Sequence, residues 1–180
     1  AYVSFDSGGW CAAAPAVIAY YMDPRNFLDG TYVFQFEELS YSADQTVEGI
    51  KAILPAELHE RASQLLQAAK ETGVSAYFLA TKIVQEGTVK NGLALGKVPG
   101  YEGYYNFFDI GAYAADGKSA VENGAIYAKN HGWSDPYKCM VDSANMLGNN
   151  YIKRGQDTPY FQKFNVTNAA SGLYRREKVG

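Results

Sequence analysis

The stretch SAYFLATKIVQEG, residues 75–87, is the part of the chain from which the fold can be worked out, because it predicts a helix with both ends marked. It opens on a serine, which is favoured at helix N-caps, and closes on a glycine, which is favoured just past a helix end. Leu79, Ile83 and Glu86 are spaced by four and three residues, so a helix places them on one stripe. Glu86 therefore shares the stripe that the apolar residues turn inward, and it lies in the last turn.

This place in a helix suits a carboxyl group that stays protonated. The helix macrodipole is negative at the C-terminal end and disfavours a carboxylate there. Partial burial also favours the neutral acid. A protonated carboxyl group in Glu86 is what is needed to give a proton to a glycosidic oxygen. The simpler interpretation is an exposed glutamate at a helix end, and periodicity alone does not separate the two.

Further helices are expected on both sides of this one. They span residues 15–21, 45–54, 57–72, 118–130 and 134–153, the last with Ser134 as its N-cap and Pro136 in its first turn. Residues 32–36 fit either a short strand or the start of a helix. Residues 87–103 are rich in glycine, and a long loop of this kind inside a compact domain is typically functional or forms a hairpin. The pattern predicts an α+β fold that is mainly α, with a small β-hairpin lobe.

Composition indicates one folded domain over residues 1–180. The chain is 47% hydrophobic and 19% charged, which is typical of globular proteins. Its net charge is −3 and it has no long basic stripe, so we expect no nucleic-acid partner. No apolar run is long enough to cross a membrane. With two His and two Cys, we expect no metal site and no cofactor, and pairing of Cys11 with Cys139 stays open.

Two other segments combine aromatic and polar side chains. Residues 105–112 place three aromatics around Asn106 and Asp109, and an amide offers a donor and an acceptor that match a sugar N-acetyl group. A buried hairpin with Asn106 capping a turn is the alternative. Residues 155–165 follow a helix end and include Tyr160, which either lines a cleft or anchors a surface loop.

Taken together, these segments resemble the glucosaminidases of glycoside hydrolase family 73, particularly the clostridial-type autolysin domains. The matching stretches occur in the family's order and cover nearly the whole chain. They are residues 18–28, 77–80, 85–87, 100–112, 127–129, 132–133, 135–137, 155–158 and 160–165.

The resemblance implies a lysozyme-like fold with two lobes around a substrate groove. It implies cleavage of the β-1,4 bond that follows N-acetylglucosamine in peptidoglycan. Glu86 matches the family's catalytic acid, and Tyr160 looks like the tyrosine that lines the catalytic groove. The motifs that border the groove give five substrate-binding candidates, which are Gln85, Tyr105, Asn106, Phe108 and Gly111.

The chain departs from the family pattern at three points. Gly87 follows Glu86 directly, where many members have one residue between them. Residues 171–180 lack the helix that usually follows in related chains. No second carboxylate is fixed by a motif, and the candidates are Glu102, Asp109 and Glu122. We therefore rank attack by the substrate's own acetamido oxygen, oriented by Tyr160 or Asn106, slightly ahead of a two-carboxylate mechanism.

Three functional alternatives stay open at this stage. A muramidase or a lytic transglycosylase of the same fold would cut the other bond of the repeat, and a non-catalytic module would bind peptidoglycan without cutting it. In the favoured interpretation the partner is the peptidoglycan glycan strand. The protein is then expected to be a secreted, cell-wall-associated monomer, excised from a longer protein whose signal or anchor lies outside residues 1–180.

Overall fold

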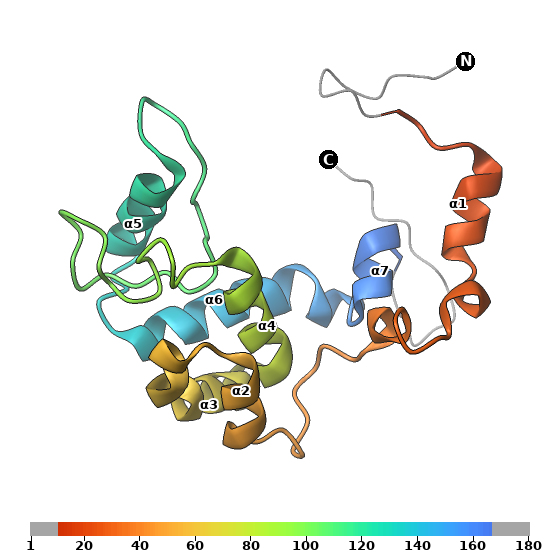
Figure 1. The fold of residues 1–180 in the computed structure, drawn as a ribbon, viewed down its shortest axis with the longest axis horizontal. Helices are drawn as coiled ribbons and strands as arrows, with labels where there is room; N and C mark the ends of the chain where they lie inside the picture. The colour runs from red at the N-terminus through yellow and green to blue at the C-terminus, as the bar shows by residue number, and fades with distance from the viewer. Residues whose placement is uncertain (1–10, 167–180) are drawn as a thin grey trace.

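The computed structural model describes residues 11–166, and these residues form helices joined by turns (Figure 1). The α-helices are α1 (Pro15–Met22), α2 (Val47–Ile53), α3 (Ala62–Thr72), α4 (Ala76–Glu86), α5 (Ala120–Asn130), α6 (Pro136–Asn150) and α7 (Pro159–Phe164). The 3₁₀ helices are η1 (Pro24–Phe27), η2 (Val33–Phe36), η3 (Ala56–Arg61) and η4 (Ile152–Arg154).

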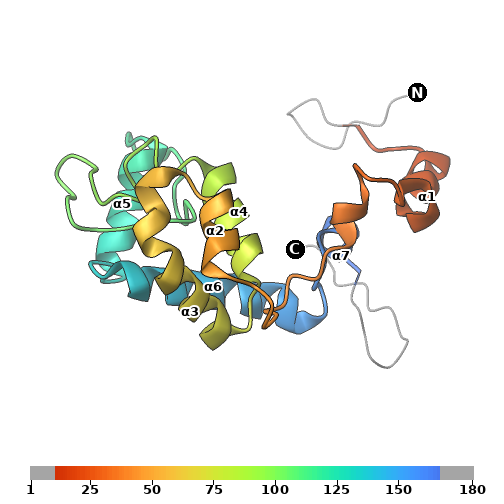
Figure 2. The same cartoon turned by 60° about the horizontal axis from the view of Figure 1, so that its bottom comes forward.

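A body of four helices holds the core. Helices α2, α3, α4 and α6 pack against one another, and α5 lies at one end of them (Figures 1 and 2). Leu65 of α3, Leu79 and Ile83 of α4 and Met140 of α6 are all 1% exposed or less. Trp133, just before α6, is fully buried and is among the largest buried side chains. Burial of these side chains stabilises the fold by about 2 kcal/mol each.

Helix α4 forms with the ends that the sequence predicts. The Ser75 hydroxyl oxygen accepts a hydrogen bond from the backbone N–H of Phe78 at 3.2 Å, which satisfies one of the unpaired donors of the first turn. Gly87 ends the helix in the left-handed region at φ +64°, where a side chain would cost energy. Glu86 is therefore fixed in the last turn of a rigid helix.

Two other helix boundaries differ from the prediction. The range 57–72 is divided, because η3 forms a separate 3₁₀ segment before α3 begins. Helix α6 is capped by Asp135 and not by Ser134: the Asp135 carboxylate accepts from the N–H of Tyr137 at 2.9 Å. Pro136 occupies the first turn, as expected.

The predicted β-hairpin lobe does not form as strands in the described part of the chain. Residues 87–118 run as successive turns beside α5 (Figure 1). The strand pairing in this region is one isolated bridge between Ala115 and Lys118. Asp116 and Gly117 between them both have positive φ, which is typical of a tight hairpin turn. Hydrogen bonds from buried side chains, described below, hold the rest of the loop without a ladder.

The N-terminal segment lies apart from the helical body. Helix α1 is on the far side of α7 in both views (Figures 1 and 2), and none of its residues is buried. Residues 32–36, expected as a strand or a helix start, contain η2, which contacts α7. No helix within residues 11–166 is long and apolar enough to cross a membrane.

The two cysteines lie in different surroundings. Cys11 is exposed, whereas Cys139 on α6 is fully buried as a thiol. Burial raises the pKa of the Cys139 thiol to about 12. The expected change at residues 171–180 lies outside the described residues.

Candidate active site

Glu86 lies at the C-terminal end of α4 with about a third of its side chain exposed. One Glu86 carboxylate oxygen, Oε1, lies 3.2 Å from Nζ of Lys82, one helical turn earlier. Lys82 Nζ also donates to Oε1 of Gln85 at 3.3 Å. The carboxyl group is thus accessible to a ligand and has one cationic neighbour on its own helix.

Buried hydrogen bonds tie the loop after Glu86 to the segment that carries Asp109. The Thr88 hydroxyl, fully buried, donates to the carbonyl oxygen of Phe107 at 2.9 Å. The backbone N–H of Asn106 donates to the carbonyl oxygen of Leu93, also at 2.9 Å. Two segments that are about twenty residues apart in sequence are therefore held side by side at the end of α4.

Asn106 is the centre of this arrangement. Its side chain is fully buried, and its amide nitrogen donates to the carbonyl oxygens of Ile110 at 2.8 Å and Gly124 at 3.1 Å. Its amide oxygen accepts from the N–H of Ile110 at 3.1 Å. Both amide hydrogens are used, so Asn106 has no donor to offer a sugar. The geometry supports the alternative from the sequence, in which this residue caps a buried turn.

That turn carries Asp109, whose carboxyl group lies within electrostatic reach of Glu86. The backbone of Asp109 is left-handed, with φ +56°, a conformation that Asp tolerates better than most residues. Its Oδ1 atom is buried and has no hydrogen-bond partner among the described residues. Burial and then the nearby charge of Glu86 raise the pKa of the Asp109 carboxyl group, while the Asn91 side chain acts in the opposite direction. The charge of Glu86 therefore influences the protonation of Asp109.

The other two candidate carboxylates lie in ordinary structural positions. Glu102 is exposed in a turn, and its carboxylate accepts from the N–H of Gly100 at 3.1 Å. Glu122 is in the first turn of α5, where the helix dipole stabilises a carboxylate, and its N–H donates to the capping hydroxyl of Ser119. Of the three candidates, Asp109 is the one for which an electrostatic interaction with Glu86 is found.

Three of the remaining groove candidates serve packing. Phe108 is 7% exposed and belongs to the core. Tyr105 stacks on Phe107 and lines a separate cavity of about 210 Å³. Gly111 has φ +72°, and a Cβ there would come within 2.4 Å of the Tyr127 ring. Gly111 is therefore required for close packing of the backbone against α5.

Tyr160 lies in α7 and is half-buried against the N-terminal segment. Its hydroxyl donates to the carbonyl oxygen of Met22, and its ring packs on Phe36 with ring centroids 5.1 Å apart. The ring also contacts Phe161 and Phe164. Tyr160 thus joins α7 to the segment that contains α1.

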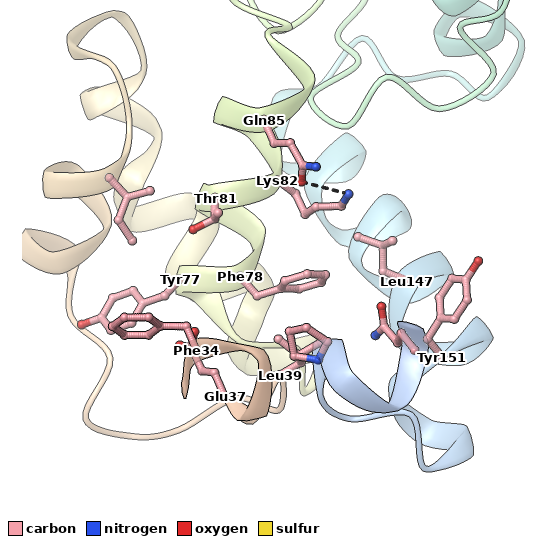
Figure 3. Close-up of a pocket in the computed structure, with 13 residues that line it drawn as sticks. Phe34, Glu37, Leu39, Tyr77, Phe78, Thr81, Lys82, Gln85, Leu147 and Tyr151 are labelled. Atoms are coloured by element: carbon pink, nitrogen blue, oxygen red, sulfur yellow. Dashed lines mark hydrogen bonds between the residues drawn. The ribbon is translucent and has the colours of Figure 1, made fainter. Parts of the chain in front are cut away.

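A cavity of about 670 Å³ lies along α4 (Figure 3). Gln85, a predicted substrate-binding residue, lines it together with Lys82. The other walls come from α2, α6, α7 and the η2 region. Their lining residues are Phe34, Glu37, Leu39, Ile53, Tyr77, Phe78, Thr81, Leu147, Tyr151, Pro159 and Gln162.

Sequence reasoning missed three residues of this site. Lys82 was detectable, because it lies four residues before Glu86, the spacing at which opposite charges meet on a helix. Thr88 and Asn91 carried no such signal, since their roles depend on contacts with residues 107 and 109. Within residues 11–166, no group of three His, Cys, Asp or Glu side chains is placed to hold a metal ion.

The chain is similar to known bacterial glucosaminidases. It is 30% identical to a β-N-acetylglucosaminidase of Bacillus subtilis strain 168 over 167 residues. The matched region covers 88% of this chain and 19% of that protein. The chain thus spans about a fifth of that curated relative. The structure of Staphylococcus aureus glucosaminidase B superposes with a TM-score of 0.72 at 31% identity, over 91% of this chain and 67% of that one.

Staphylococcus aureus autolysin E is a second structural neighbour. A catalytic glutamate-to-alanine mutant of autolysin E in complex with the disaccharide NAG-NAM has a TM-score of 0.59 at 25% identity, over 96% of this chain and 75% of that one. Autolysin E has also been solved in complex with the muropeptide NAM-L-Ala-D-iGlu. No family model matches the chain. From its identity to glucosaminidase B and the shared fold, the chain belongs to the family of bacterial glucosaminidases.

Proposed function

We propose that this chain is an endo-β-N-acetylglucosaminidase that cleaves the β-1,4 bond between N-acetylglucosamine and N-acetylmuramic acid in peptidoglycan, with Glu86 as the general acid. The observation that carries this proposal is Glu86, a partly exposed carboxyl group at the C-terminal end of α4 in a chain of the glucosaminidase family. The resemblance to glycoside hydrolase family 73 supports the same assignment.

The choice of Glu86 as the acid rests on its access to a ligand at the end of α4 and on its match to the family's catalytic position. Glu86 is more accessible than Asp109, because Oδ1 of Asp109 is buried. The catalytic glutamate of autolysin E, a structural neighbour, supports the choice of a glutamate as the acid.

We assign the attack on the anomeric carbon to the substrate's own 2-acetamido oxygen. As the bond from the anomeric carbon to the 4-oxygen breaks, Glu86 gives its proton to that oxygen, and the acetamido oxygen bonds to the anomeric carbon. Water then opens the resulting ring. We assign the orientation of the acetamido N–H to Asp109. The side chains of Asn106 and Tyr160, which the sequence suggested for this role, already have protein partners.

The proposed substrate places the protein outside the cytoplasm. Peptidoglycan is the partner, and we expect a secreted, wall-associated monomer that needs neither a cofactor nor a nucleic acid. The name autolysin, carried by a structural neighbour, supports action on the bacterial cell wall.

The test is a digestion of purified peptidoglycan with the wild type and with Glu86→Gln. The products are reduced with borohydride, and the reduced sugar is identified by mass spectrometry. Reduced N-acetylglucosamine from the wild type, with at least a thousandfold less from Glu86→Gln, is expected for the loss of a general acid in this mechanism. Reduced muramic acid or an anhydro sugar would assign the chain to the muramidases or transglycosylases. Binding without any product would indicate a non-catalytic module.

A second experiment tests the substrate-assisted step. Glu102, Asp109 and Glu122 are each replaced by the corresponding amide, and azide is added to each variant. We expect no glycosyl azide, because no carboxylate forms a covalent intermediate or activates the water alone. One variant could instead lose activity as completely as Glu86→Gln does, and azide could restore its cleavage of the substrate with a glycosyl azide as the product. That result would mean that the two-carboxylate mechanism holds.

A further inference from the structure

We propose that the 670 Å³ cavity along α4 binds the peptide stem that the muramic acid residue carries, so that the enzyme prefers peptide-bearing strands to naked glycan. This inference rests on the proposed function, and it adds a recognition site beside the glycosidic chemistry. The occupant is a short peptide with a carboxylate near the sugar and an amino group further along.

The first argument is the position of the cavity. Tyr77, Thr81 and Gln85 are spaced by four residues along α4, so they form one stripe that ends next to Glu86. Lys82 lines the cavity and also contacts the Glu86 carboxylate at 3.2 Å. A substrate with its sugar at Glu86 therefore has the mouth of this cavity beside it.

The second argument is charge. Figure 3 shows Lys82 and Gln85 toward one end of the cavity and Glu37 at the opposite end, and Lys82 also contacts the Glu86 carboxylate. A stem peptide begins at the lactyl group of the muramic acid. Its free carboxylate comes at the second residue, an isoglutamate, and its free amine comes at the following diamino acid. The carboxylate would meet Lys82, and the amine would meet Glu37, so the order of charges matches the direction of the cavity.

The third argument is the apolar wall between these charges. Phe78 and Leu147 line the cavity between its two ends, Phe34 lines it beside Glu37, and the volume lies within the range of sites for small ligands (Figure 3). Aliphatic parts of a peptide can pack there. A peptide offers groups that complement the charges of Lys82 and Glu37 as well as the apolar wall, whereas a neutral sugar complements neither charge, which is why we favour the peptide over a flanking sugar of the strand.

The experiment compares two substrates for each enzyme variant. The first is soluble peptidoglycan strands with intact stems, and the second is the same strands after an amidase has removed the stems. Thr81→Trp fills the cavity from an exposed position on α4. Val84→Trp is the matched control, because it adds the same bulk at an exposed position of the same helix that does not line the cavity. A thermal melt checks that each variant is folded.

We expect the wild type to cleave intact strands with a kcat/KM about tenfold higher than stripped strands, as one charge-assisted hydrogen bond would give. Thr81→Trp should bring this ratio close to one without lowering the rate on stripped strands, and Val84→Trp should keep the wild-type ratio. Glu37→Gln should lower the ratio for stems with a free amine and should not change it once that amine is acetylated.

Each other outcome has a distinct meaning. Equal rates on both substrates in the wild type overturn the inference and leave the glucosaminidase proposal intact. If Thr81→Trp slows both substrates equally while Val84→Trp slows neither, the cavity holds a sugar of the strand, and the inference is again wrong. If the folded wild type cleaves neither substrate, the proposed function itself fails.

Discussion

Asp109 is a residue whose charge works against the stability of the fold. Its pKa is raised in the folded protein by burial and by the charge of Glu86, so the folded state binds the proton more tightly than the unfolded chain does. The stability that this proton contributes is fully present below the unfolded pKa of about 3.9. This stability is lost as the pH rises through the raised pKa of Asp109 in the folded protein.

We therefore expect Asp109→Asn to be at least as stable as the wild type at pH 7 and at least tenfold less active, if Asp109 orients the acetamido group. The stability difference should shrink as the pH falls below about 4. Urea denaturation at several pH values measures the first effect, and kcat/KM on peptidoglycan strands measures the second.

Asp116→Asn is the matched control for this substitution. Asp116 also has a positive φ, +53°, but it is exposed in the turn before α5. The same chemical change there should leave both stability and activity near the wild-type values. A loss of stability at pH 7 in Asp109→Asn would contradict the assignment, because it would mean that the Asp109 carboxylate is needed by the fold.

At the scale of one element, α4 depends on how it ends. Gly87 has φ +64°, and a Cβ added there would meet no atom within 4 Å. The cost of Gly87→Ala is therefore conformational and should be about 1 kcal/mol. Gly87→Asn should cost less, because Asn tolerates the left-handed region. Thermal melts of both variants check this order, and equal costs would show that the space around residue 87 matters more than its φ angle.

The ends of α4 were predictable because they depend on residues within the helix and its caps. Ser75 and Gly87 act locally, and Leu79 and Ile83 show the buried stripe directly. The cap of α6 was placed one residue early, since Ser134 and Asp135 are both good caps and the sequence does not rank them. Local chemistry thus predicts the existence of a helix more reliably than the residue at which the helix begins.

The loop after α4 and the site it builds were less predictable. Glycines between 87 and 103 fit a hairpin as well as a series of turns. Two hydrogen bonds between distant parts of the chain decide the structure, namely that of Thr88 to residue 107 and that of the Asn106 side chain to residue 124. Two further bonds of the Asn106 side chain hold the local turn to residue 110. Glu86 was found from its own helix, whereas choosing Asp109 from three carboxylates required these long-range contacts.

For the whole molecule, the uneven distribution of burial predicts uneven local stability. Helices α3 and α4 each bury at least four residues, whereas α1 buries none. Amide hydrogens of α1 should exchange with solvent at least a hundredfold faster than those of α4, because α1 can open without disturbing the core. Hydrogen exchange followed by mass spectrometry on peptides of the two helices measures the ratio. Comparable protection would mean that the N-terminal segment unfolds together with the helical body.

The buried thiol of Cys139 has a consequence for how the folded protein withstands oxidants. Oxidants attack the thiolate form of cysteine, and this thiol is both enclosed by α6 and its neighbours and held protonated by burial. Chemical damage at this position must therefore wait until the helical body opens. The resistance of Cys139 to oxidants is then set by how rarely the helical body opens, and not by the reactivity of the sulfur atom.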